Sequence, residues 1–233
     1  MAFSVQDSAA LHSWQQRAVV RSLGPARVRG IAGASRAVEA ARDLAAETGS
    51  PAFTVQQVVD RAGISLKSFY RHFAGKDDVL LALFEEDNRR GAEALAAMVE
   101  MQTPSAERLR TCVAGLFAIM ARTPQQRAYM SVMVREHLRL AEQRPAELRA
   151  VLEPFVELLR SELAAAMELG VVRAGDAGRD AVTVLHLVIA NLQAIILGQV
   201  DDDPAEVGEY LWGFCRVALL TPSHGSSRPE RAS

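Results

Sequence analysis

Apolar residues recur at intervals of three and four along most of the sequence, the spacing that places them on one face of a helix. Between residues 31 and 48, this face consists of Ile31, Ala34, Val38, Ala41 and Ala45. Scarce aromatic residues and abundant alanine and leucine also favour helix over strand. The pattern predicts an all-α fold with helices over residues 31–48, two short helices within 54–76, and helices over 76–100, 105–121, 125–142, 145–169, 177–199 and 204–220.

Prolines punctuate this pattern. Four of them lie near predicted helix starts, where proline costs least: Pro104, Pro124, Pro145 and Pro204. Pro154 lies inside the predicted helix 145–169, so it predicts a kink or a division there.

The stretch TVQQVVDRAGISLKSFYRHFAGK, residues 54–76, reads as two short helices joined by a tight turn. Thr54 caps the first helix, and Gln57, three residues later, completes a capping box. Gly63 accepts the positive φ that a sharp turn requires. Ser65 caps the second helix. This is the layout of a helix-turn-helix, whose second helix enters the major groove of DNA.

The second short helix has two distinct faces. Phe69 and Phe73 lie four residues apart and are expected to face inward. The outward face is left to polar and aromatic side chains: Lys67, Ser68, Tyr70 and Arg71. After it, Asp77 and Asp78 open the helix 76–100, where negative charge is favoured by the macrodipole. Gly91 in that helix is either a point of bending or a tolerated glycine.

These residues, together with others at fixed spacing, carry a resemblance to a known family. The matching positions are Ala40-Ala41, Leu44-Ala45, Gly49, Thr54, Val58, Ala62-Gly63-Ile64-Ser65, Phe69-Tyr70, His72-Phe73 and Lys76. They resemble the N-terminal domain of the tetracycline-repressor (TetR) family over residues 30–86. The chain departs from the family in having Leu66-Lys67 where Lys-Gly is common, which bears on the operator sequence it would read.

The resemblance implies a set of DNA contacts. Tyr70 matches a tyrosine that packs on the DNA backbone, and Lys76 matches a lysine that grips phosphate. Lys67 and Arg71 are long donors on the outer face and are candidates for direct contacts. The predicted DNA-binding residues are Thr54, Gln56, Ser65, Lys67, Ser68, Tyr70, Arg71, His72 and Lys76. The alternative is an ordinary exposed residue at each position and, for His72, a capping or packing histidine.

Charge is unevenly distributed along the chain. Residues 1–76 contain ten Lys and Arg against five Asp and Glu, whereas the remainder contains sixteen against 23. A basic N-terminal part suits a DNA-reading domain on a body that need not touch DNA. The two cysteines, Cys112 and Cys215, lie in apolar helical patterns and are expected to be free buried thiols in a reducing cytosol.

The predicted organisation is therefore a three-helix DNA-binding domain followed by a helical ligand-binding and dimerisation domain. Its divisions are 1–29, a basic N-terminal extension; 30–76, the helix-turn-helix domain; 77–221, the effector-binding and dimerisation domain; and 222–233, a disordered tail. The extension is either a mobile segment or an arm that touches phosphates or the minor groove.

Residues 181–198 are apolar almost all round. A membrane span is one reading, but His186, Asn191 and Gln193 lie inside the segment and three aspartates follow it. We expect instead a helix buried on every side. The resemblance implies that the last two helices form a homodimer interface, through Val182, Leu185, Ile189, Leu192, Ile196, Leu211, Phe214 and Val217.

A ligand pocket is expected among the helices of the C-terminal part, mostly on the strength of the resemblance. Its candidate lining residues are Leu116, Phe117, Met120, Tyr129, Met130, Met133, His137, Phe155, Leu159 and His186. Further polar anchors are Arg135, Asn191 and Gln193. The alternative for each residue is a place in the core.

We expect a cytoplasmic, ligand-responsive repressor that binds a palindromic operator in double-stranded DNA as a homodimer and is released by a largely apolar small molecule. The alternative is a helical ligand-binding or adaptor protein of the same fold without specific DNA binding. An enzyme is the other rival, but no phosphate-binding glycine loop, nucleophile elbow or paired carboxylates are apparent. No catalytic residue, metal or cofactor is predicted, and no membrane partner.

Overall fold

The computed structural model describes residues 27–103, 105–119 and 123–220. The helices within these ranges are α2 (Arg27–Thr48), α3 (Val55–Ala62), α4 (Leu66–His72), α5 (Lys76–Glu100), α6 (Ala106–Ile119), α7 (Pro124–Gln143), α8 (Pro145–Glu168), α9 (Ala177–Ile196) and α10 (Pro204–Leu219). No strand is present in the described ranges, so the predicted all-α fold is confirmed.

The bounds follow local signals in the sequence. Pro124, Pro145 and Pro204 each stand in the first turn of a helix, as expected. Pro154 lies inside α8, which continues through it without division. Helix α2 begins at Arg27, four residues before the predicted start. The predicted extension 1–29 lies largely outside the described residues, as do Met120 and the predicted tail.

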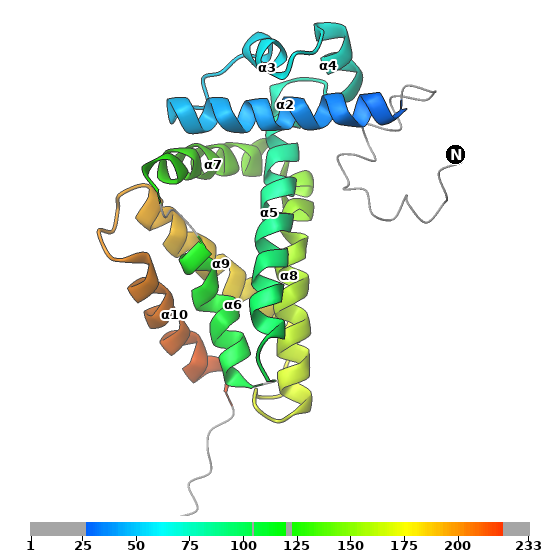
Figure 1. Ribbon diagram of the computed structural model, residues 1–233. Coiled ribbons are helices and arrows are strands. Elements are labelled where there is room, and N and C mark those ends of the chain that lie inside the picture. The colour runs from blue at the N-terminus through cyan, green and yellow to red at the C-terminus, as the bar shows by residue number, and fades with distance from the viewer. Residues whose placement is uncertain (1–26, 104, 120–122, 221–233) are drawn as a thin grey trace, which may run out of the picture.

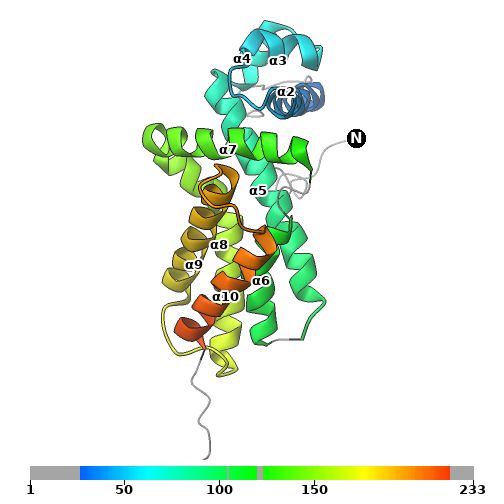
Figure 2. The same cartoon turned by 90° about the vertical axis from the view of Figure 1, so that its left-hand side faces the viewer.

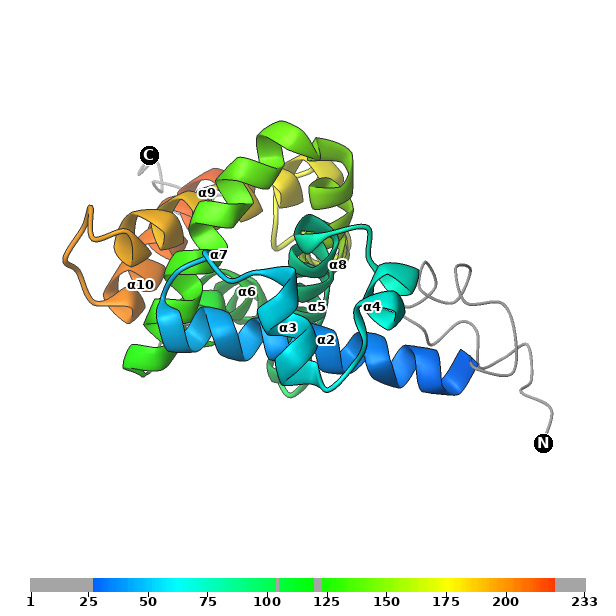
Figure 3. The same ribbon diagram turned by 90° about the horizontal axis from the view of Figure 1, so that it is seen from above.

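Helices α2, α3 and α4 form a head at one end of the molecule (Figure 1). Seen from above, α3 lies over the middle of α2 (Figure 3). The predicted capping box of α3 is present, with Thr54 and Gln57 exchanging hydrogen bonds. Gly63 ends α3 at φ 60°, a left-handed conformation that favours glycine. The Ser65 side chain caps α4.

Helix α5 runs from the head down into a body built from α6, α8, α9 and α10, while α7 lies across the top of the body beneath α2 (Figure 1). The body has its own apolar core around Leu95, Phe117 and Leu163. A second apolar core joins the head to α7 and the start of α8, through Val132, Leu140 and Leu148. The head therefore rests on the body through packed apolar side chains, with α7 as the shared element.

Helix α9 is, among the described helices, the one long and apolar enough to cross a membrane. It packs against α6, α7, α8 and α10 of the body, which accounts for part of its apolar surface. The two cysteines are free and buried, as expected. Burial raises the pKa of the Cys112 thiol to about 12, so the thiolate is disfavoured at neutral pH.

Candidate nucleic-acid interface and ligand cavity

The outer face of α4 is held by an aromatic anchor beneath it. Phe69 is completely buried and Phe73 nearly so, with their ring centroids 5.4 Å apart. Tyr70 is 56% exposed and its ring stands edge-on to Phe69, with centroids 5.4 Å apart. Lys67 and Arg71 are exposed on the same helix. The buried pair thus fixes a short helix whose outer face carries two cations and a phenol.

The other predicted contact residues take part in local hydrogen bonds. Ser65 Oγ accepts from the amide of Ser68 at 3.1 Å. Gln56 Nε2 donates to Asp60 Oδ1 at 2.7 Å. Arg71 Nη2 donates to Ser68 Oγ at 3.3 Å. Thr54, as noted above, caps α3 and is exposed. These bonds hold the side chains on the surface, where they remain next to solvent.

Two predicted residues lie differently from the others. His72 is only 4% exposed, which agrees with the packing alternative, so we omit it from the DNA-reading face. Lys76 Nζ donates to the carbonyl oxygen of Pro51 and lies 4.6 Å from the centre of the Phe53 ring. The Lys76 ammonium is therefore engaged within the head, and its reach toward a phosphate would require these contacts to open.

The first turn of α5 is clamped to the body by ion pairs. Arg139 of α7 donates to both oxygens of Asp77, at 2.6 and 3.2 Å. Arg144, between α7 and α8, donates to Asp78 at 2.6 Å. Asp78 also accepts from the amide of Ala74 at 2.8 Å, in the turn that follows α4. Residues next to the helix-turn-helix are thus tied directly to body arginines.

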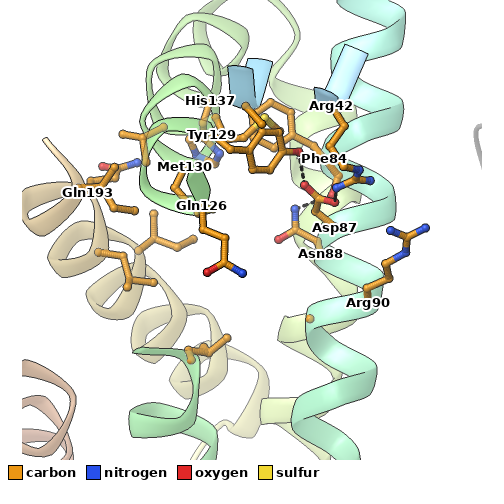
Figure 4. A pocket seen from close by; sticks show the side chains of 18 of the residues that line it. Arg42, Phe84, Asp87, Asn88, Arg90, Gln126, Tyr129, Met130, His137 and Gln193 are labelled. Atoms are coloured by element: carbon orange, nitrogen blue, oxygen red, sulfur yellow. Dashed lines mark hydrogen bonds and ion pairs between the residues drawn. The ribbon is translucent and has the colours of Figure 1, made fainter. Parts of the chain in front are cut away.

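A cavity of about 820 Å³ lies where the head meets the body (Figure 4). It is lined by α2, α5, α6, α7, α8 and α9. The lining residues are Arg42, Asp43, Ala46, Phe84, Asp87, Asn88, Arg90, Gly91, Ala94, Leu116, Thr123, Gln125, Gln126, Tyr129, Met130, Met133, Val134, His137, Leu152, Phe155, Ile189, Leu192, Gln193 and Ile196. Its volume lies in the range of sites for drug-sized ligands.

One part of the cavity wall is a polar network that spans three helices. Asp87 of α5 accepts from Arg42 of α2 and from the Tyr129 hydroxyl of α7 (Figure 4). Although burial lowers it, the net pKa of Arg42 is raised by the neighbouring charge of Asp87. Burial, together with that same charge, raises the pKa of Tyr129 well above its ordinary value. Arg42 is therefore a cation and Tyr129 a neutral donor at neutral pH.

The remaining wall is mainly apolar. Phe155 of α8 lies against Gly91 of α5, where an added Cβ would be 2.9 Å from the phenyl ring. A larger residue at Gly91 would therefore require Phe155 to shift, and α5 continues through Gly91 unbroken. His137 stands edge-on to Phe84 with centroids 6.0 Å apart. Burial, and to a lesser degree the charge of His186, lowers the pKa of His137, which favours the neutral ring.

Six of the ten predicted pocket residues line this cavity: Leu116, Tyr129, Met130, Met133, His137 and Phe155. Phe117 instead packs against Gly208 of α10, and Leu159 lies in the body core. His186 is exposed on α9, and Met120 lies outside the described residues. Of the further polar anchors, Gln193 lines the cavity, Asn191 does not, and Arg135 is exposed.

The sequence reasoning missed the contributions of α2 and α5, including Arg42, Asp87 and Asn88. The available signal was a run of polar residues, Asp87 to Arg90, on the part of α5 that lies beyond the head. Charged residues at this spacing are usually solvated, so the sequence alone favoured an exposed face.

The predicted dimer stripe divides between the interior and the surface. Leu185, Leu192 and Leu211 are buried within the single chain. Ile189, Leu192 and Ile196 line the cavity. The exposed apolar residues of α9 and α10 are Val182, Tyr210, Phe214 and Val217, at 39, 80, 61 and 82%. Helices α9 and α10 lie side by side on one face of the body (Figure 2), so these residues mark its apolar surface.

A buried aromatic pair under an exposed cationic helix, joined through α5 to a helical body with a large cavity, is the architecture of a helix-turn-helix protein with a second, all-helical domain. A sequence profile described as "Bacterial regulatory proteins, tetR family" matches residues 37–83, which span the second half of α2, α3, α4 and the start of α5. The N-terminal part of the chain is therefore similar to the DNA-binding domain of TetR-family transcriptional regulators.

Solved structures share the fold over about four fifths of the chain. The fatty acid degradation regulator FadR from Bacillus halodurans has a TM-score of 0.61 at 19% identity, covering 82% of this chain and 95% of its own. FadR from Bacillus subtilis, in complex with stearoyl-CoA, has a TM-score of 0.62 at 17% identity, covering 78% and 96%. SmeT, the repressor of the Stenotrophomonas maltophilia efflux pump SmeDEF, has a TM-score of 0.62 at 20% identity, covering 82% and 91%. A search of curated proteins finds no match by sequence.

Proposed function

We propose that the protein is a cytoplasmic repressor that binds a palindromic operator as a homodimer and releases it when a largely apolar small molecule enters the cavity. The observation that carries this proposal is that the cavity is lined by α2 of the head as well as by body helices. A ligand in the cavity would therefore touch the DNA-reading head directly.

The proposed DNA-reading face consists of Lys67, Ser68, Tyr70 and Arg71 on α4, with Gln56 on α3 and Thr54 at the N-cap of α3. Three of these, Lys67, Tyr70 and Arg71, are exposed on a helix that the Phe69–Phe73 pair holds in place. Cations on such a helix supply phosphate contacts and base-edge donors, which give affinity and sequence choice respectively.

Dimerisation is proposed through the exposed apolar residues of α9 and α10. Phe214 and Val217 are 61 and 82% exposed on α10, and large apolar side chains gathered on one surface mark an interaction site. A two-fold pair would place two α4 helices about 34–36 Å apart, one turn of DNA. Leu185, Leu192 and Leu211 are buried within the single chain, so we leave them out of the proposed dimer interface and keep the exposed residues.

Release follows from differential binding. We take the head to have two positions relative to the body, one that fits the operator and one that does not. A ligand shifts the equilibrium between these positions only as far as its affinities for the two differ. The apolar wall formed by Leu116, Met133 and Phe155 suits an apolar ligand body. Because FadR of Bacillus subtilis, which shares the fold, is described with stearoyl-CoA, acyl compounds are the effectors to test first.

The test is fluorescence anisotropy of the full chain on the intergenic DNA beside its own gene, with a scrambled duplex as control, across a salt series. Specific binding as a dimer, weakening as salt rises, supports the proposal. A folded dimer that binds both duplexes equally would contradict it for this site and favour the alternative, a helical ligand-binding or adaptor protein without specific DNA binding.

A further inference from the structure

We propose that the effector carries an acidic group that binds Arg42, so that the ligand is an amphipathic acid whose anchor belongs to the DNA-binding head. This inference rests on the proposed function and deepens it, because it names the chemical class of the effector. It also names the residue through which the effector acts on α2.

Arg42 has a donor to spare. Its Nη1 donates to Asp87 and its Nε lies 3.3 Å from Glu39 Oε2. Its Nη2 is buried and has no acceptor among the described residues. A buried donor without an acceptor costs free energy, so a ligand acceptor that reaches Nη2 after a shift of the surrounding side chains gains a bond that this group now lacks. A carboxylate is the best partner because a charged acceptor forms shorter and stronger hydrogen bonds with a guanidinium than a neutral acceptor does.

Two acidic groups that face the Arg42 guanidinium, Asp87 and Glu39, are already engaged, whereas Asp43 is exposed on the same wall. Asp87 accepts from both Arg42 and the Tyr129 hydroxyl. Glu39 faces both Arg42, at 3.3 Å, and Arg90, at 3.4 Å. A cationic ligand would have to displace one of these arginines, whereas an anionic ligand meets an unused N–H. At the Arg42–Asp87 pair, the cavity wall thus favours an incoming acceptor over an incoming donor.

Polar side chains beside Arg42 are suited to the same ligand. Gln126 projects into the cavity on the side of the Arg42–Asp87 pair (Figure 4). Its Oε1 accepts from the amide of Thr123 at 2.9 Å, which leaves its amide nitrogen as the group that can donate. Met130, Met133 and Phe155 continue the lining away from these donors. An acid head at Arg42 and an apolar body among the methionines would fill both parts.

The arrangement gives the ligand a competitor within the protein. A ligand carboxylate that takes Arg42 weakens the bond between Arg42 of α2 and Asp87 of α5, which joins head to body. Asp87 would keep the Tyr129 hydroxyl. Removal of the Asp87 charge, which competes with the ligand for Arg42, should therefore strengthen binding of an acid. Removal of Arg42 should abolish the preference for an acid over an alcohol. A merely structural ion pair would lose affinity in both cases.

The probes are decanoate, decanol, decylamine and decanoyl-CoA, titrated calorimetrically into the full-length protein at neutral pH. We expect decanoate to bind about tenfold or more tighter than decanol, the range of a charged hydrogen bond. Arg42→Met should erase that difference, and Asp87→Asn should tighten decanoate severalfold while leaving decanol unchanged. Circular dichroism checks that each variant is folded, and the ranking of probes on the unmodified protein stands even where a variant fails to fold.

Three results would overturn the inference. They are equal affinity for decanoate and decanol, a preference for decylamine that Asp87→Asn removes, and binding of decanoyl-CoA alone with no effect of Arg42→Met. Operator binding by the ligand-free protein is measured alongside. If it is specific while decanoate does not bind, the inference fails and the proposed regulator stands. If it is absent, the proposed function itself fails.

Discussion

Phe155 of α8 occupies the space that a side chain on Gly91 of α5 would fill, since an added Cβ would lie 2.9 Å from its ring. Both residues line the cavity. The cavity wall is therefore set by a contact between the helix that descends from the head and a helix of the body. Its shape depends on α5 staying close to α8.

Gly91→Ala should push Phe155 toward the cavity and reduce its volume. Overpacking of a filled site costs about 1–3 kcal/mol of stability. We expect weaker binding of decanoate and a lower midpoint of urea unfolding. The double variant with Phe155→Leu should recover much of both losses, because the smaller side chain leaves room for the methyl group. Equal effects in the single and double variants would contradict the contact.

Arg144→Gln should weaken the coupling between cavity and head. It removes the 2.6 Å pair with Asp78 in the first turn of α5. Because both side chains are partly exposed, the loss of stability should be small, about 0.5–1 kcal/mol. The fold-change in operator affinity on adding ligand should fall more noticeably. Arg160→Gln is the matched control, since Arg160 of α8 pairs with Glu157 of the same helix, three residues away. A similar effect of both variants would rule out a special role for Arg144.

Replacement of both Lys67 and Arg71 by alanine should weaken operator binding and flatten its dependence on salt. Each lost phosphate contact reduces the slope of log affinity against log salt by about one. Arg149→Ala, an exposed cation on α8, is the control for net charge. Anisotropy at several salt concentrations measures the slope. An unchanged slope in the double variant would show that α4 does not contact phosphate through these residues.

His137 should make the fold less stable in mild acid. Burial lowers its pKa in the folded state, so the unfolded chain binds a proton more readily. Stability from this residue is complete above the ordinary histidine pKa of about 6.5 and declines as pH falls below it. Urea unfolding at neutral pH and in mild acid should show a smaller pH effect for His137→Gln than for the unmodified protein. His186→Gln, an exposed neighbour, should change the pH effect less.

Local signals in the sequence predicted the head well. The Thr54–Gln57 capping box, the turn at Gly63 and the cap at Ser65 depend on residues within four positions of one another. The start of α5 was likewise predicted, because Asp77 and Asp78 stand in its first turn. Such features need no knowledge of the tertiary packing.

The cavity and the dimer surface were predicted only in part because both depend on how helices pack. Arg42 reaches the cavity because α2 lies on α7, a contact between segments far apart in the chain. On a helix that is apolar nearly all round, periodicity does not distinguish the buried residues Leu185 and Leu192 from the exposed residue Val182. Their burial in the body distinguishes them. Spatial neighbours, rather than sequence spacing, decide these assignments.

The most direct test of a ligand acting on the head through the cavity is the reciprocity of the two binding events. The affinity of decanoate is measured by calorimetry on the free protein and on the protein saturated with its operator. Operator affinity is measured with and without decanoate. If the two sites are coupled, bound operator must lower the affinity for decanoate by the same factor by which bound decanoate lowers the affinity for the operator. We predict equal factors well above one. Decanoate that binds in the cavity with no change in operator affinity would contradict the account.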